Sequence, residues 1–161
     1  TGNHHPSIAP YGLFHTADAP IQVSVASAPL WRAFAAVVGV DADDERFATN
    51  SDRVAHRDEL TRLVESAFAD SSAQTWLQRL SDAGVPAGKV RTLDDVYDWA
   101  QTRSQHLVVE VDHPTLGRIE LPGPPLRFDD EPFAGGRAQH DAPPLLGQHT
   151  DEVLAWLGLT P

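Results

Sequence analysis

Hydrogen-bonding and titratable side chains gather at the start of this chain, in the order Asn3, His4, His5, Ser7 and Tyr11. Amide, hydroxyl and imidazole groups exchange hydrogen bonds with ligands, and an imidazole also titrates near neutral pH. Prolines and glycines in the same stretch disfavour a helix and an extended segment follows, so we expect a loop anchored on a strand. On residue types alone this N-terminal loop (residues 1–12) is either a polar lead-in with exposed histidines or a ligand contact.

The other side chains that could do chemistry form no self-contained site. The eight histidines are not spaced like zinc ligands, and without cysteine the chain has no disulfide, thiolate metal site or cysteine nucleophile. The acidic run at residues 41–45 lacks the glycine turn of a calcium loop, which favours a solvated loop and a short helical turn at Arg46 and Phe47. We expect no metal site, and we interpret Asp18, Asp94 and Asp95 as turn and cap residues.

The formal net charge of -11 argues against nucleic acid and anionic membranes as main partners, because both need a basic protein surface. A basic pocket for a phosphorylated ligand would draw on Arg32, Arg46, Arg53, Arg57, Lys89 or Arg91, or on another chain. No apolar run approaches the roughly 20 residues of a membrane span, and no signal peptide is visible, so we expect a cytoplasmic protein. Methionine is absent even at position 1, which leads us to expect a piece of a longer protein.

Hydrophobic periodicity predicts a small α/β domain over residues 13–105. Alternating apolar residues predict strands at residues 13–17 and 21–26, with a short strand at 89–91. Apolar residues at helical spacing predict helices at about residues 29–38, 52–69 and 73–83, and from Thr92 to about Arg103. Asn50 or Ser51 is expected to cap the second of these, and a capping box at residues 71–74 is expected to open the third.

Residues 106–161 have a different character. A turn at residues 113–117 between two apolar runs predicts a hairpin, with strands at residues 107–111 and 118–121. Residues 122–144 are rich in proline and predict an extended arm. A last helix at about residues 150–157 has an apolar face that we expect to dock on another domain or chain. The expected fold class is thus α/β, an α+β small domain with a C-terminal arm and helix.

Several stretches, in their order and spacing along nearly the whole chain, resemble the family III CoA-transferases, also called the CaiB/BaiF family. They are GNHHPSIAPY (2–11), TAD (16–18), Trp31, RFATN (46–50), RVAHR (53–57), Trp76, AGVPAG (83–88), HPTLG (113–117) and PPLLGQHT (143–150). The resemblance covers the C-terminal half of a family member, that is, its small domain and C-terminal return segment.

The resemblance implies that a Rossmann-like large domain with most CoA contacts and the catalytic aspartate lies in an N-terminal half absent from this chain. That aspartate attacks an acyl-CoA thioester and carries the acyl group as an anhydride, so that CoA moves between an acyl-CoA and a carboxylic acid. Coenzyme A is then a substrate rather than a tightly bound cofactor. The resemblance also implies an interlocked homodimer. We expect no catalytic residue in this fragment and no activity from it alone.

The resemblance further implies that the N-terminal loop closes over the active site and excludes water from the acyl intermediate. The substrate-facing residues are then Gly2, Asn3, His4, His5, Pro6 and Tyr11, with His4 or His5 able to hydrogen-bond an acyl carboxylate. Two alternatives stay open. The first is a 2-methylacyl-CoA racemase of the same family, which moves a proton, and the second is an interaction module without activity. The acyl group, the acceptor acid and the pathway do not follow from these residues.

Overall fold

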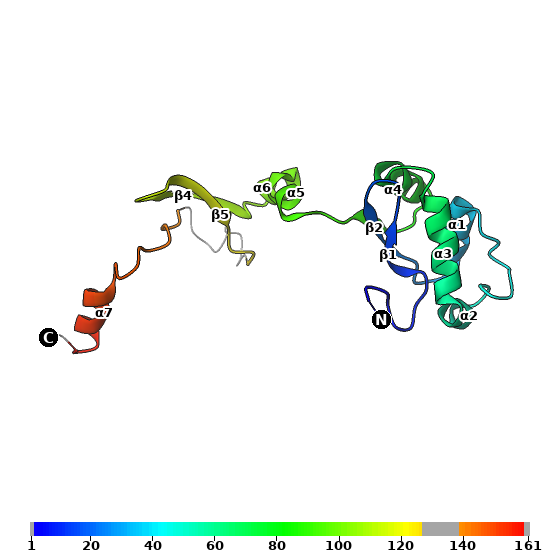
Figure 1. Cartoon of the computed structure of the whole chain (residues 1–161), viewed down its shortest axis with the longest axis horizontal. Helices are drawn as coiled ribbons and strands as arrows, with labels where there is room; N and C mark the ends of the chain where they lie inside the picture. Colours follow the sequence, from blue (N-terminus) through cyan, green and yellow to red (C-terminus); the bar gives the residue numbers. More distant parts are fainter. Residues whose placement is uncertain (1, 127–138, 160–161) are drawn as a thin grey trace. The chain divides into compact units, whose positions relative to one another are not determined.

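The computed structural model describes residues 2–126 and 139–159, in two compact units that divide between Val90 and Arg91 (Figure 1). This division lies earlier in the chain than the one after residue 105 that the sequence suggested. Much of the predicted proline-rich arm lies outside the described residues. Helices and antiparallel strands are both present, and the expected α/β class is confirmed. Within the described ranges, no helix is long and apolar enough to cross a membrane.

The first unit contains an antiparallel sheet of β1 (Tyr11–His15), β2 (Pro20–Ser24) and β3 (Ala87–Lys89), in that order. Burial alternates along β1 and β2, so that Phe14, Ile21 and Val23 turn to the core. The strands exist as predicted, but each begins earlier in the sequence than expected. The Oγ1 of Thr16 donates to the carbonyl oxygen of Ala19 at 2.6 Å, which closes a turn directly after β1 and ends the strand there.

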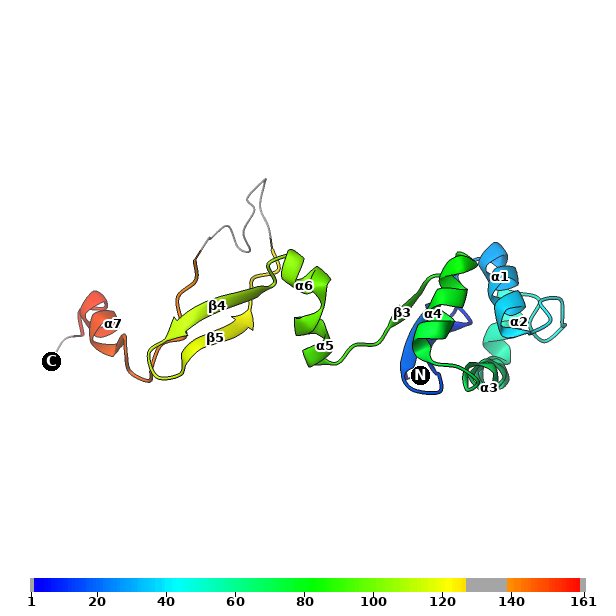
Figure 2. The ribbon, with the colours of Figure 1, turned by 90° about the horizontal axis from the view of Figure 1, so that it is seen from above.

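Helices α3 (Arg57–Phe68) and α4 (Ala73–Asp82) pack against this sheet, and α1 (Ala28–Val38) packs on these two helices (Figures 1 and 2). The ring of Phe68 is central, with its centroid 6.2 Å from Phe14, 6.3 Å from Phe34 and 4.8 Å from Trp76. All of these rings are buried, and the indole nitrogen of Trp76 donates to the carbonyl oxygen of Phe68 at 3.0 Å. An aromatic core therefore fixes the position of α3 on the sheet.

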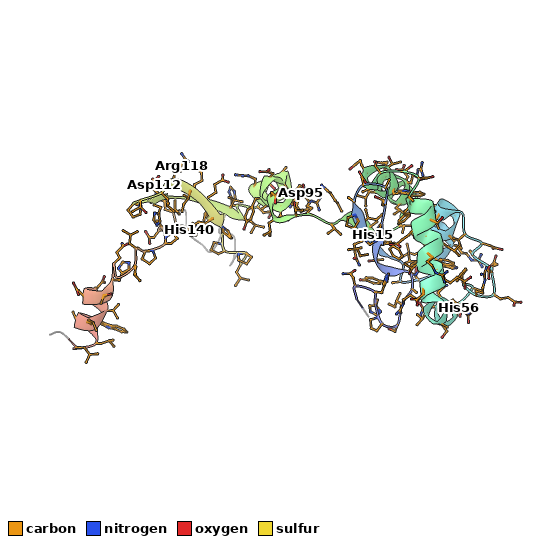
Figure 3. The ribbon with its side chains drawn as sticks, viewed as in Figure 1. His15, His56, Asp95, Asp112, Arg118 and His140 are labelled. Carbon is orange, nitrogen blue, oxygen red and sulfur yellow. The ribbon has the colours of Figure 1, made fainter. Side chains whose placement is uncertain are left out.

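The predicted long helix at residues 52–69 is wrong, because the chain forms α2 (Asn50–Ala55) and then α3, with His56 between them. His56 leaves helical geometry at φ -103° and ψ 27°, and both its backbone N–H and its Nδ1 bond the carbonyl oxygen of Asp52. Such side-chain to backbone bonds compete with a continuous helix. Figure 3 labels His56 at this junction.

The predicted caps of α2 and α4 are wrong by one residue. Thr49, rather than Asn50 or Ser51, caps α2 in a capping box, where Thr49 Oγ1 accepts from the N–H of Asp52 and the Asp52 carboxylate accepts from the N–H of Thr49. Ser72, rather than Ser71, caps α4. Where the sequence predicted a short helical turn at residues 46–47, the structure has a turn closed by the N–H of Phe47, which donates to the carbonyl oxygen of Asp44 at 2.7 Å.

The second unit contains α5 (Leu93–Asp98), α6 (Ala100–Ser104), α7 (Thr150–Trp156) and a hairpin of β4 (Val108–His113) and β5 (Gly117–Pro122). The hairpin and the last helix confirm their predictions. The single helix expected from Thr92 is broken at Trp99, whose ψ is 128° and whose ring lies 3.8 Å from the Arg91 guanidinium. Among the described residues of this unit, Val111 is the only buried hydrophobic residue. The core of the chain therefore lies in the first unit.

Candidate functional site

Two backbone hydrogen bonds tie the N-terminal loop to the sheet and to the chain that follows it. The backbone N–H of His5 donates to the carbonyl oxygen of Tyr11 at 2.9 Å, which folds the loop back on the start of β1. The N–H of Val25 donates to the carbonyl oxygen of Pro10 at 3.1 Å, which ties the loop to the chain after β2. The loop thus has a defined path beside the sheet.

Asn50, at the start of α2, binds the middle of the loop. Its Nδ2 donates to the carbonyl oxygen of Ser7 at 2.8 Å, and its Oδ1 accepts from the N–H of Ala9 at 3.2 Å. One amide side chain therefore satisfies a donor and an acceptor of an irregular backbone that has no strand partner. Because Thr49 provides the helix cap, the Asn50 side chain is available for this contact.

Arg53 joins the loop to the core from α2. Its Nε donates to the carbonyl oxygen of Ala9 at 2.6 Å, and one terminal nitrogen donates to the carbonyl oxygen of Phe47 at 2.9 Å. The guanidinium lies 4.6 Å from the ring of Trp31, and the residue is only 3% exposed. Burial lowers the pKa of Arg53, with partial compensation from Asp52. Carbonyl oxygens and an aromatic face thus stabilise this buried cation.

Arg57, in the first turn of α3, binds the tip of the loop. One of its terminal nitrogens donates to the carbonyl oxygen of His5 at 2.8 Å and to that of Pro6 at 3.0 Å. Its Nε is buried without a hydrogen-bond partner. Together with Asn50 and Arg53, this side chain fixes the loop through backbone groups.

The other basic side chains proposed for a phosphate pocket have different partners. Arg32 pairs with Asp43 at 2.7 Å, and Arg46 pairs with Asp44 at 2.6 Å and also with Glu59. The acidic run is therefore held by arginines, and no group of metal ligands is present in the part of the chain that the structure describes. Hydrogen bonds from Arg46 lower the pKa of Asp44 to about 2.

His4 packs against the small domain. Its ring meets that of Phe14 edge to face, with centroids 5.4 Å apart. A Cβ atom on Gly12 would lie 2.5 Å from the Nδ1 of His4, so the absence of a side chain at Gly12 makes room for the imidazole. His4 therefore contributes to packing of the loop on β1.

His5 is oriented differently from His4. Its ring centroid lies 5.2 Å from that of Tyr11, and its Nδ1 accepts from the backbone N–H of Ser7 at 3.2 Å. Because a backbone N–H can only donate, the neutral imidazole carries its hydrogen on Nε2, where it can donate to a ligand. Of the other predicted site residues, Gly2, Asn3 and Pro6 are exposed.

Sequence reasoning missed the anchoring role of the residues on α2 and α3. Asn50, Arg53 and Arg57 follow one another at spacings of three and four, which places them on one face of a helical segment. This group of polar side chains on one face of the segment was the signal from which their anchoring role could have been predicted. The sequence prediction instead gives Asn50 as a possible helix cap and Arg53 and Arg57 as possible phosphate ligands.

The model of CoA-transferase family III matches residues 1–150 of the chain. The chain is 33% identical over 155 residues to succinyl-CoA:glutarate CoA-transferase of Mus musculus, an alignment that covers 95% of the chain and 35% of the mouse protein. It is 31% identical over 134 residues to acetyl-CoA:oxalate CoA-transferase of Acetobacter aceti, covering 80% of the chain and 33% of that protein.

Solved structures of similar fold also come from this family. A crystal structure of a CAIB/BAIF family protein from Brucella suis matches with a TM-score of 0.73 and 30% identity, covering 98% of this chain and 40% of that one. The resemblance deduced from the sequence motifs is confirmed, and the chain spans about a third of the length of these curated relatives. The chain belongs to CoA-transferase family III.

Proposed function

We propose that this chain is the C-terminal part of an enzyme that moves CoA between an acyl-CoA and a carboxylic acid. A carboxylate oxygen of an aspartate outside this chain attacks the thioester carbonyl, the carbon–sulfur bond breaks and CoA leaves as the thiolate. An N-terminal large domain provides that aspartate and most of the CoA contacts, and two copies of the whole protein form an interlocked dimer. The family membership of residues 1–150 and the greater length of the relatives support this assignment.

We further propose that the acceptor is a small dicarboxylic acid. The names of relatives include the dicarboxylates glutarate, oxalate and mesaconate. The second carboxylate of such an acid needs a hydrogen-bond donor in the acyl site. His5 suits this role because its Nδ1 accepts from Ser7, which leaves the Nε2–H as the donor.

The observation that carries the role of the N-terminal loop is its attachment to α2 and α3 through backbone groups. Such attachment fixes the path of the loop without using the polar atoms of Asn3 or the Nε2 of His5. In the proposed enzyme the loop forms a wall of the acyl site and excludes water, which would otherwise hydrolyse the acyl anhydride.

The test is an assay of the longer protein that contains this chain, with succinyl-CoA as donor and glutarate, oxalate or mesaconate as acceptor. Mass spectrometry is expected to detect the CoA ester of at least one acceptor, with a stoichiometric amount of free succinate. The 161-residue chain alone is the control and is expected to form no CoA ester.

Three results would contradict the proposal. The first is exchange of the α-proton of a 2-methylacyl-CoA for deuterium without any CoA transfer, which would assign a racemase. The second is the absence of both reactions in a folded full-length protein, which would favour an interaction module. Transfer catalysed by the 161-residue chain alone would contradict the location of the aspartate.

A further inference from the structure

Arg57 differs from Arg53, the other arginine that anchors the loop, in what it contacts. Arg53 also binds Phe47 and stacks on Trp31, so it belongs to the core as well as to the loop. The hydrogen bonds of the Arg57 side chain, in contrast, go to the loop alone, at the carbonyl oxygens of His5 and Pro6. Removal of Arg57 thus changes contacts of the loop, as removal of Asn50 would, and leaves the aromatic core intact.

The positive charge of Arg57 is not used in an ion pair with any described carboxylate. Two acids of α3 have other partners, since Glu59 pairs with Arg46 and Glu65 pairs with His15. The guanidinium instead strengthens its hydrogen bonds to the two carbonyl oxygens, because a charged donor binds more tightly than a neutral one. The buried Nε has no hydrogen-bond partner, which adds a desolvation cost at this side chain.

We propose that Arg57 is a positioning residue that holds the tip of the N-terminal loop, residues 4–7, in place during CoA transfer. This inference rests on the proposed function, because it gives the loop its role in excluding water. By fixing the carbonyl groups of two successive peptides, His5–Pro6 and Pro6–Ser7, Arg57 sets where the imidazole of His5 presents its Nε2–H. Because Arg57 binds only backbone carbonyl oxygens, the side chains of the loop can vary without loss of these hydrogen bonds.

The experiment compares Arg57→Ala with Arg62→Ala. Arg62 lies on the same helix, is exposed and donates only to the carbonyl oxygen of Asp58 within α3, so its removal gives the same change of charge without touching the loop. In the 161-residue chain, amide exchange is followed at His5 and Ser7. Ala9, whose N–H is held by Asn50, is the internal reference.

We expect exchange at His5 and Ser7 to rise about tenfold in Arg57→Ala, which is the effect of losing one charge-assisted hydrogen bond. Exchange at Ala9, and all exchange in Arg62→Ala, should stay near the values of the parent chain. In the full-length protein, Arg57→Ala should raise the ratio of acyl-CoA hydrolysis to CoA transfer several-fold, and Arg57→Lys should restore part of the loss. A merely structural change would lower both reactions together.

The proposal is overturned if exchange at His5 and Ser7 in Arg57→Ala equals that in Arg62→Ala. It is also overturned if the loop exchanges faster while the ratio of hydrolysis to transfer is unchanged. If the parent full-length protein transfers no CoA, the proposed function fails. The proposed role of Arg57 during CoA transfer then fails as well. Amide exchange then still decides, by itself, whether Arg57 holds the loop.

Discussion

The Nε of Arg53 donates to the carbonyl oxygen of Ala9 at 2.6 Å, across a sequence separation of 44 residues. Both groups are buried, and the same guanidinium also donates to the carbonyl oxygens of Phe47 and Ala48. One side chain therefore connects the N-terminal loop, the turn before α2 and the core residue Trp31, whose ring lies against the guanidinium. Position and stability of the loop are coupled at this residue.

Replacing Arg53 with Ala should destabilise the first unit by about 3 kcal/mol, because buried carbonyl oxygens lose their donor and Trp31 loses its stacked partner. Urea unfolding followed by tryptophan fluorescence measures this change. Arg53→Lys should recover only part of the loss, since an ammonium group cannot reproduce the planar fork. Arg62→Ala is the control and should change stability by less than about 0.5 kcal/mol. An equal, small effect of both alanine variants would contradict the anchoring role of Arg53.

Replacing Gly12 with Ala tests the packing of His4 on β1. The new Cβ would lie 2.5 Å from the Nδ1 and 3.1 Å from the Cα of His4, so the loop must shift. We expect a loss of about 1–3 kcal/mol, as for other overpacked sites. Gly88→Ala is the matched control in β3, because a Cβ there has nothing within 4 Å.

A second substitution distinguishes the contribution of the His4 ring from that of the His4 backbone to the contact with Gly12. His4→Ala removes the imidazole and should restore part of the stability of Gly12→Ala, but not all, since the Cα of His4 stays close. Chemical denaturation of the two single variants and the double variant gives the coupling. Strict additivity would show that the ring of His4 does not pack over Gly12.

Periodicity was sufficient to predict the sheet, the hairpin and most helices, because alternation and helical spacing reflect which face is buried. It failed where neighbouring residues compete for one role. Thr49, Asn50 and Ser51 are all good helix caps, and only the folded structure shows that Thr49 takes the cap while Asn50 binds the loop. The anchoring of the loop depends on long-range contacts, such as that of Arg57 with His5, which no local pattern encodes.

Thr49→Ala should destabilise α2 by about 1 kcal/mol, because the capping box loses the oxygen that accepts from the N–H of Asp52. Thermal unfolding measures the loss, and Thr49→Ser should retain most of the stability. Since α2 carries Asn50 and Arg53, amide exchange at Ala9 should also increase. Thr92→Ala removes the equivalent cap of α5 in the second unit and should leave Ala9 unchanged. A matching change at Ala9 in both variants would argue against a local effect.

Asp44 should titrate with a pKa of about 2, because its carboxylate accepts hydrogen bonds from the side chain and the backbone N–H of Arg46. This pKa lies below the ordinary value, so the ionised carboxylate stabilises the folded state at neutral pH. That contribution is complete above about pH 4 and is lost as pH falls through about 2. Carbon-detected NMR titration of the Asp44 carboxyl group measures the shift.

Arg46→Gln should raise the pKa of Asp44 toward the ordinary value, but only in part, because the backbone N–H of residue 46 still donates to the carboxylate. Asp43 is the internal control, since Arg32 rather than Arg46 lowers its pKa. In this variant the loss of stability as pH falls from about 4 to about 2 should be smaller than in the parent chain, because the folded and unfolded pKa values of Asp44 lie closer together. An unchanged Asp44 titration in Arg46→Gln would show that the guanidinium is not the main cause of the low pKa. The acidic run would then need another source of stabilisation.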